Sequence, residues 1–381
     1  MKKLILALGM ALALTVGCNN TNQEETEKPD EVSETTETTI ETETEKETEI
    51  AEEESEEETE KETEGEEVSG RFTQEFDLSN HEAGESVRLW VPHAKTNDFQ
   101  EISNVEITTE AGDPVDYSVN TDEIGNEMIY VEWTPEETNR KLKYSFDVTR
   151  KERLKQDFAP EEEIKEEDFQ DYLNSSKLVP VGGPLAELTE EVTGEKQTVE
   201  EKSRAIYDYI FQNMERNNDV IGCGPGDVLK TLETKDGKCT DLNSVYVALA
   251  KSAGIPARET FGVRISKEKG ADMTKGQHCW AEYYQPGTGW VITDVADVLK
   301  AVLNDDLEKD SPEAKELYDY YYGNADALRV AFSQGRDLTL NPEQAAGPLN
   351  QFGYPYAEID GEPIDFHSPD EFIYSFTFDA E

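Results

Sequence analysis

The chain has 381 residues and a formal net charge of -51 at pH 7, with 86 Asp and Glu against 35 Lys and Arg. This length leaves room for two compact domains after leader and linker segments are subtracted. The charge excludes nucleic acid as a partner, because a phosphate backbone is bound by surfaces rich in lysine and arginine.

The first residues are typical of an export signal. Two lysines precede an apolar run over 4–16 that is too short to span a bilayer. Residues 15–18 read Thr-Val-Gly-Cys and resemble a bacterial lipobox, whose cysteine is acylated and becomes the new N-terminus. We therefore expect a lipoprotein-type signal peptide over 1–17, a lipid on Cys18, and an extracytoplasmic, membrane-anchored protein. An ordinary secretory signal that contains a cysteine is the alternative.

An acidic low-complexity segment follows the signal. Residues 21–70 hold 23 Asp and Glu but 3 Lys, together with many threonines and almost no large apolar side chains. Such a composition buries too little surface to offset the entropy of ordering the chain, and its charges repel one another. We predict a disordered Glu/Thr-rich tether over 18–70.

Residues 71–150 show the alternation of apolar and polar side chains that is typical of half-buried strands. Turn residues such as Gly112, Pro114 and Gly125 separate these runs. The pattern predicts a small β-sandwich-like accessory domain without a nucleophile or metal cluster. The predicted strands lie within residues 71–76, 86–91, 104–107, 128–133 and 142–148.

The next segment, 151–195, is rich in charge and ends in glycines and prolines, so we interpret it as a connector. Residues 198–201 read Thr-Val-Glu-Glu and fit a capping box, and apolar residues then recur at helical spacing. We expect the first helix of a catalytic domain here. That domain is predicted over 196–345, followed by a C-terminal extension over 346–381.

Cys239 begins a second helical pattern. Leu242, Val245, Tyr246 and Leu249 follow it on one face, and Gly254 and Pro256 mark the end. A thiol at a helix start lies beside free backbone amides and the positive end of the helix dipole, which lower its pKa. The same amides can receive an oxyanion. Cys239 is therefore the candidate nucleophile.

Two strand-like runs, 277–284 and 289–294, are separated by a turn and predict an antiparallel pair. His278 lies near the start of the first run and Asp294 at the end of the second, so the two side chains can meet across the ladder. One ring nitrogen can then face Cys239 while Asp294 holds the other. Asp297 is the alternative orienting carboxylate.

Apart from Cys18, the cysteines are Cys223, Cys239 and Cys279. An odd number in an exported chain leaves one free thiol beside one potential disulfide. Cys279 should face away from His278, and it is interpreted either as packing or as a disulfide partner of Cys223. No CxxC pair occurs, which argues against a zinc site.

Four blocks of sequence together resemble the bacterial transglutaminase-like superfamily, over about residues 198–300. This resemblance implies an α+β, papain-like transglutaminase core, in which a helix presents Cys239 against an antiparallel sheet that carries His278 and Asp294. A small β-sandwich-like domain would precede this core. The blocks are residues 237–241 (Gly-Lys-Cys-Thr-Asp), 253–258 (Ala-Gly-Ile-Pro-Ala-Arg), 278–282 (His-Cys-Trp-Ala-Glu), and 289–290 (Gly-Trp) with Asp294.

The triad predicts acyl transfer by a thiolate. We expect hydrolysis of peptide or glutamine amide bonds in a protein or peptide substrate, with protein cross-linking as the alternative. A catalytically silent surface lipoprotein that binds a partner is the alternative from another class. We predict no organic cofactor and no metal.

Overall fold

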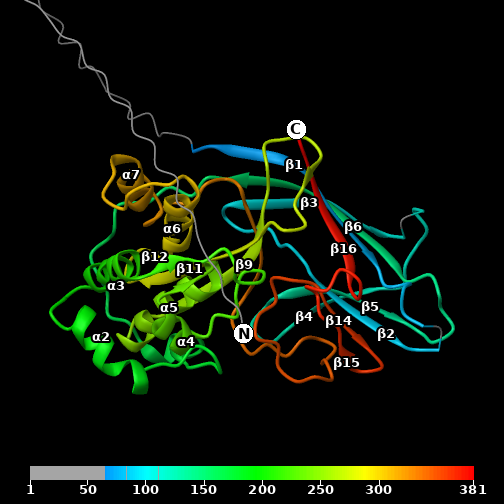
Figure 1. The fold of residues 1–381 in the computed structure, drawn as a ribbon, viewed down its shortest axis with the longest axis horizontal. Helices are drawn as coiled ribbons and strands as arrows, with labels where there is room; N and C mark the ends of the chain where they lie inside the picture. Colours follow the sequence, from blue (N-terminus) through cyan, green and yellow to red (C-terminus); the bar gives the residue numbers. More distant parts are fainter. Residues whose placement is uncertain (1–64, 83, 110) are drawn as a thin grey trace, which may run out of the picture. The chain divides into compact units, whose positions relative to one another are not determined.

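The computed structural model describes residues 65–82, 84–109 and 111–381 (Figure 1). The predicted signal peptide, Cys18 and the predicted tether up to residue 64 lie outside the described residues. The tether was predicted to end at residue 70, but strand β1 already begins at Glu67. Val68 explains this earlier start, because it is buried and pairs with Arg150 of a neighbouring strand.

One five-stranded sheet is built around the long strands β1 and β6. Buried and less buried residues alternate along β1, as the sequence predicts, and Phe72 pairs with Phe146 on one side and with Phe378 on the other. The C-terminal strand β16 thus lies beside the first strand of the fold. The order is β10 (Ala271–Asp272), β16 (Ile373–Ala380), β1 (Glu67–Asp77), β6 (Lys141–Lys151) and β3 (Gln100–Thr108).

A second five-stranded sheet faces the first, and their inner side chains share one hydrophobic core. This arrangement contains the strands that the sequence predicts within 71–150. Both sheets, however, also take strands from the region that we named the C-terminal extension. The order of the second sheet is β15 (Glu362–Pro363), β14 (Tyr356–Ile359), β2 (Val87–Pro92), β5 (Glu127–Trp133) and β4 (Ser118–Thr121).

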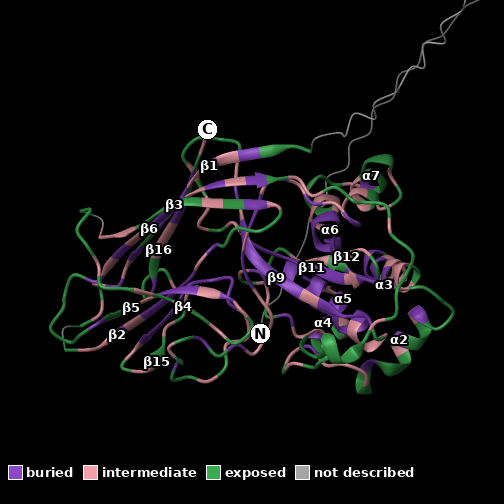
Figure 2. Ribbon diagram, turned by 180° about the vertical axis from the view of Figure 1, so that it is seen from behind, coloured by how far each residue is buried: buried purple, intermediate pink, exposed green. Residues whose placement is uncertain are grey.

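A four-stranded antiparallel sheet carries the candidate active site, and helices cover one of its faces (Figure 1). Its strand β9 is almost wholly buried, as Figure 2 shows. The other face meets the sandwich, because Val263 and Val330 belong to the sandwich core. The strand order is β12 (Gly289–Thr293), β11 (Gln277–Gln285), β9 (Ala257–Arg264) and β13 (Arg329–Gln334).

The helix α3 confirms the predicted capping box. The Thr198 hydroxyl accepts from the Glu201 amide at 3.1 Å, and the Glu201 carboxylate accepts from the Thr198 amide. None of the helices in the described part is long and apolar enough to cross a membrane. The helices are α1 (Gln170–Leu173), α2 (Ala186–Thr193), α3 (Val199–Asn213), α4 (Val228–Thr234), α5 (Cys239–Ser252), α6 (Val295–Asn304) and α7 (Pro312–Tyr320).

Short elements complete the chain, and all described residues belong to one compact unit. Strand β8, which pairs in parallel with β7, lies immediately before α5 and leads the chain into the candidate nucleophile. These elements are the 3₁₀ turns η1 (Glu166–Asp168) and η2 (Gly183–Leu185) and the strands β7 (Glu215–Arg216) and β8 (Asp236–Gly237).

The helix α5 is buried on every side. Its residues from Cys239 to Ala250 are all buried, although the sequence pattern predicts only one buried face. The helix packs on β11 and β9 of the sheet and is covered by α3, α4 and α6. A helix enclosed in this way is held rigidly, so the position of its first residue is fixed by packing.

Candidate active site

Cys239 is the first residue of α5, as the sequence predicts, and its side chain is 3% exposed. Asp241 fixes this helix start. Its carboxylate accepts hydrogen bonds from the amide of Lys238 at 3.0 Å and from the amide of Gly226 at 2.8 Å. The helix start and the loop before it are therefore held by the same side chain.

The loop over 221–226 lies against the nucleophile. Gly224 has a φ of +86°, and a Cβ there would lie 2.0 Å from Oδ2 of Asp241, so only glycine fits this position. The carbonyl of Cys223 accepts from the amide of Thr240 at 2.9 Å. Of the first two amides of α5, that of Cys239 thus remains for a substrate oxyanion.

Three free thiols meet at this point, because Cys223 and Cys279 both contact Cys239. The prediction that Cys279 packs on the helix layer is confirmed, since its thiol donates to Oγ1 of Thr240 at 3.4 Å. The alternative of a Cys223–Cys279 disulfide is wrong for this structure, in which the thiol of Cys223 donates to the carbonyl of Gln277 at 3.1 Å.

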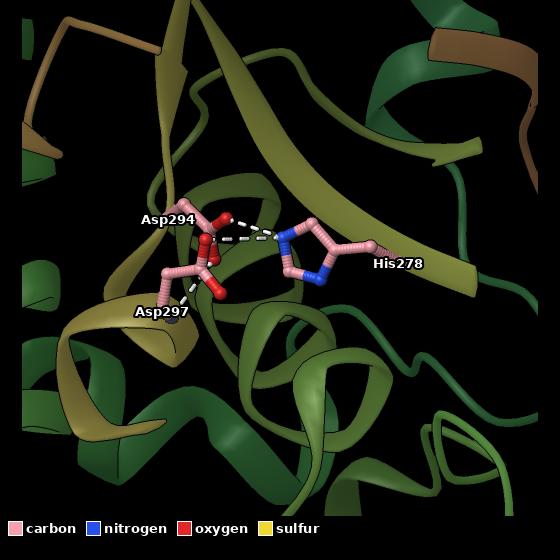
Figure 3. A group of neighbouring side chains, drawn as sticks. All are labelled: His278, Asp294 and Asp297. Carbon is pink, nitrogen blue, oxygen red and sulfur yellow. Dashed lines mark hydrogen bonds and ion pairs between the residues drawn. The ribbon is translucent and has the colours of Figure 1, made fainter. Parts of the chain in front are cut away.

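His278 lies on β11, and Asp294 lies directly after the neighbouring strand β12, where it is the N-cap of α6. The Nε2 of His278 is 2.7 Å from Oδ2 of Asp294, and both side chains are buried. Figure 3 shows this nitrogen directed at the carboxylates and the other ring nitrogen pointing away from them. The side chain of His278 also lies next to the Cys239 thiol, which itself donates to the carbonyl of Cys223 at 3.9 Å. The structure thus brings the three predicted residues into one continuous chain of contacts.

Asp297, the alternative orienting residue, lies farther from the histidine, with its Oδ2 3.6 Å from Nε2 of His278. Asp294 also begins the helix α6, because its Oδ1 accepts from the amide of Asp297 at 3.2 Å. One oxygen of Asp294 therefore faces His278 while the other caps a helix. This double use fixes the carboxylate in place.

Two arginines neutralise these carboxylates. Arg329 on β13 is fully buried, donates to Asp294, and donates to Asp297 at 2.8 Å. Arg264 at the end of β9 forms an ion pair with Asp297. Buried carboxylates need such partners, because an unpaired charge in the interior is costly.

The electrostatics favour a thiolate at Cys239. Burial alone would raise the pKa of Asp294, but the positive charges of His278 and Arg329 hold it below its ordinary value. Contact with the polar thiols of Cys223 and Cys279, and then the nearby side chain and charge of His278, lower the pKa of Cys239 well below that of an ordinary thiol despite burial. The pKa of Cys223 is correspondingly raised by its contact with that thiolate.

The same cluster has the residue types of a metal site. His278, Asp294 and Asp297 offer one ligand atom each within 4.8 Å of one another. Arg329 already places its positive charge against both carboxylates, and Arg264 binds Asp297 as well. A metal ion would be repelled by these guanidinium groups, so the donor set suits a histidine–carboxylate pair and does not suit a cation.

Two supporting residues were missed in the sequence. Asn243 donates to the carbonyl of Cys279 at 3.0 Å and to Oδ1 of Asp294 at 3.2 Å, which links α5 to β11 and to the start of α6. Its spacing of four residues from Cys239 places both on one face of the helix, and that spacing is a usable signal. Arg329 stands in an apolar run, and nothing in its local sequence connects it with Asp294.

The chain is similar to known proteins in sequence and in fold. The model of the "Transglutaminase-like superfamily" matches residues 186–295. An uncharacterized protein of Haemophilus influenzae is 34% identical over 332 residues, which cover 80% of this chain and 89% of that protein. The Bacillus subtilis protein YebA is 30% identical over 140 residues, which cover 32% of this chain and 19% of YebA.

Among solved structures, a chain described as a candidate cysteine protease from Cytophaga hutchinsonii has a TM-score of 0.49 and 17% identity. That match covers 83% of this chain and 99% of the other one.

Proposed function

Since this chain belongs to the transglutaminase-like superfamily, whose members are generally cysteine-based enzymes, we propose that it transfers acyl groups through Cys239, His278 and Asp294. The contact of His278 with Asp294, 2.7 Å long and buried next to a thiol at a helix start, carries the proposal. A histidine oriented by a carboxylate beside a thiol of lowered pKa is the arrangement that nucleophilic catalysis by cysteine requires.

The first step forms an acyl-enzyme. The thiolate of Cys239 attacks the carbonyl carbon of a peptide bond or of a glutamine side-chain amide, and the oxyanion is received at the amide of Cys239. His278, oriented by Asp294, gives the proton that it took from the Cys239 thiol to the departing amine as the C–N bond breaks. The product is a thioester on Cys239 and a free amine or ammonia.

The second step releases the acyl group. A water molecule gives one proton to the neutral His278 and attacks the thioester carbon, and the C–S bond breaks to restore the thiolate. The product acid leaves, and His278 is again protonated. An amine that replaces the water yields a new amide, which is the cross-linking reaction.

We favour hydrolysis of peptide or glutamine amide bonds, in a protein or peptide substrate, over cross-linking. The test incubates the full chain with a glutamine-containing peptide, with and without a labelled primary amine, and identifies the products by mass spectrometry. Hydrolysis predicts a cleaved or deamidated peptide in both reactions. Incorporation of the amine as the main product would favour cross-linking.

Matched variants make this test specific to the triad. Cys239→Ala and His278→Ala should abolish turnover, whereas His93→Gln, which changes a histidine of the sandwich, should retain it. An absence of turnover in the unmodified chain with every peptide would contradict the enzyme proposal. A cellular phenotype that Cys239→Ala leaves intact would favour the silent binding lipoprotein instead.

We also propose that the protein is exported and lipid-anchored, on the evidence of the lysines, the apolar run and Cys18 in residues 1–18. Metabolic labelling with an alkyne-tagged fatty acid should modify the protein but not its Cys18→Ser variant. Equal labelling of both, or labelling of neither, would contradict the anchor.

A further inference from the structure

We propose that the cavity beside Cys239 is a substrate-binding site for acidic peptides, in which Lys238 and Lys275 bind a carboxylate next to an apolar part of the substrate. The inference rests on the proposed function, because it concerns the peptide that Cys239 attacks. It adds the class of substrate, which neither the triad nor the family defines.

The cavity has a volume of about 440 Å³ and three walls. The loop that carries Cys223 forms the first, the segment from Thr274 to Gln277 forms the second, and the C-terminal region from Tyr354 to Tyr374 forms the third. Its volume lies in the range of ordinary ligand pockets.

The cavity reaches the nucleophile through its lining residues. Cys223, which lines it, contacts the Cys239 sulfur, and Lys238 directly precedes Cys239. Gln277, another lining residue, directly precedes His278. A peptide in this cavity would therefore lie next to the reacting thiol and its base.

The C-terminal wall is held tightly against the Cys223 loop. The hydroxyl of Tyr354 donates to the Cys223 sulfur at 3.2 Å. A Cβ on Gly222 would lie 2.3 Å from the ring of His367, so the loop and the wall pack without a gap at this point. The shape of the cavity is thus set by the fold before any substrate binds.

The lining residues include no carboxylate, although the chain carries 86 Asp and Glu against 35 Lys and Arg. Three other cavities in the described part each include at least one, such as Glu282, Asp77 or Glu259. The cavity beside Cys239 instead presents two lysines and His367. Its charge is opposite to that of the molecule as a whole.

Both lysines are available to a ligand. Among the described residues, no carboxylate forms a salt bridge with Lys238 or with Lys275. Three acids lie close to the lining without belonging to it. Asp241 accepts from the amide of Lys238 at 3.0 Å, Asp272 from the amide of Thr274 at 2.9 Å, and Asp365 from the amide of His367 at 2.8 Å. These carboxylates limit the positive potential of the cavity, but within the described part of the chain they form no salt bridge with either ammonium group.

The rest of the lining is apolar and aromatic. The rings of Tyr354 and Phe366 stack with centroids 4.6 Å apart. Ile221 is 72% exposed at the rim, and Ile373 is 42% exposed. An exposed apolar rim around a charged site suits a peptide that pairs an apolar side chain with an acidic one.

Two sources can supply the carboxylate, namely an Asp or Glu side chain or the α-carboxylate of a peptide end. Four peptides of one sequence distinguish them: Glu or Gln beside the residue that is attacked, each with a free or an amidated C-terminus. Lysine binds a side-chain carboxylate and an α-carboxylate alike, as a point charge. The comparison of Glu with Gln and the comparison of free with amidated C-termini are therefore both needed.

The test has two readouts. Binding of the fluorescently labelled peptides is measured with the full-length Cys239→Ala chain, where no turnover occurs, and kcat/KM is measured with the unmodified chain. We expect the preferred acidic peptide to bind about fivefold more tightly than its neutral counterpart, the size of a partly exposed ion pair. The preference should weaken as salt is added.

Variants assign the preference to the cavity. The double variant Lys238→Gln with Lys275→Gln should remove it and act on KM more than on kcat. Lys196→Gln, an exposed lysine that does not line the cavity, should retain it. Equal binding of acidic and neutral peptides, or a preference that survives the double variant, would overturn the inference.

The two readouts also separate the proposals. Turnover without a charge preference would contradict the acidic-peptide site and leave the enzyme intact. A charge preference that depends on the two lysines, in a chain without turnover, would contradict the enzyme proposal and support the binding site.

Discussion

The Nε2 of His278 lies 2.7 Å from Oδ2 of Asp294, and their side chains are only 6% and 0% exposed. Water is therefore excluded from this pair, which makes its electrostatic interaction stronger than at a surface. The pair connects the candidate nucleophile at the start of α5 with the buried ion pairs that Arg329 and Arg264 form with Asp294 and Asp297.

Asp294→Asn should lower activity about 10²- to 10⁴-fold, because the imidazolium of His278 loses its orienting charge. Asn retains a side-chain oxygen that can cap α6, so the fold should persist. Asp297→Asn is the matched control, since Asp297 lies 3.6 Å from the same nitrogen. This variant should lower activity less than about tenfold. Steady-state rates measure both effects. A larger loss from Asp297→Asn would make Asp297 the orienting residue.

Arg329→Met should destabilise the protein by about 3–5 kcal/mol, because Asp294 and Asp297 lose a buried cation. Urea denaturation followed by circular dichroism measures the change in the free energy of unfolding. Arg71→Met removes ion pairs with Glu106 and Asp147 at a more exposed place and should cost no more than about 1 kcal/mol. Equal losses of unfolding free energy in the two variants would show that the buried ion pairs stabilise the protein no more than the exposed ones.

The sequence predicts the parts of the site that depend on local pattern. The helix that starts at Cys239 and the antiparallel pair of β11 and β12 are confirmed, because helix capping and alternation are set by neighbouring residues. The predicted second strand, however, ends at Thr293, so Asp294 meets His278 just beyond the ladder, as the N-cap of α6. The sequence pattern of α5 shows one apolar face, whereas tertiary packing buries the whole helix. The local pattern does not show that elements distant in the sequence cover the other faces of the helix.

What the sequence does not predict depends on long-range pairing. Strand β16 pairs with β1 and strand β14 with β2, so the C-terminal region completes both sheets of the sandwich. Arg329 reaches Asp294 only because β13 lies beside β9, and its local sequence is that of an ordinary strand. Strand order is a property of the whole fold and is not encoded in single segments.

Gly224→Ala should destabilise the loop beside the nucleophile, since the added Cβ would lie 2.0 Å from Asp241. The control is Gly125→Ala, which has a similar φ of +87° but no atom within 4 Å of the added Cβ. Both variants pay about the same backbone strain. Gly224→Ala should therefore have a clearly lower Tm than Gly125→Ala, and its Cys239 should be alkylated more slowly. Identical Tm values for the two variants would contradict the close approach.

Glu282 should make stability depend on pH in the acid range. Burial would raise the pKa of this carboxyl, but the charges of Arg258 and Arg153 hold it at about 2. A depressed folded pKa contributes stability that is present above the unfolded value, near 4.3, and is lost as pH falls toward 2. The contribution of the Glu282 carboxylate to the free energy of unfolding is on the order of 3 kcal/mol.

The measurement compares urea midpoints at pH 6 and at pH 3. Glu282→Gln should flatten this part of the profile, whereas Glu308→Gln, at an exposed position, should leave it unchanged. A profile of Glu282→Gln that parallels the unmodified chain would show that the pairing with Arg258 and Arg153 is not linked to folding.

The reactivity of Cys239 against pH decides whether the thiol is an activated nucleophile. The full chain and its His278→Ala variant are treated with iodoacetamide from pH 5 to pH 9, and peptide mass spectrometry follows Cys223, Cys239 and Cys279 separately. We predict that Cys239 is alkylated first, with a midpoint well below the value of about 8.5 for a free thiol, and that His278→Ala raises this midpoint. Alkylation without preference for Cys239, or an unshifted midpoint in both proteins, would contradict the proposed active site.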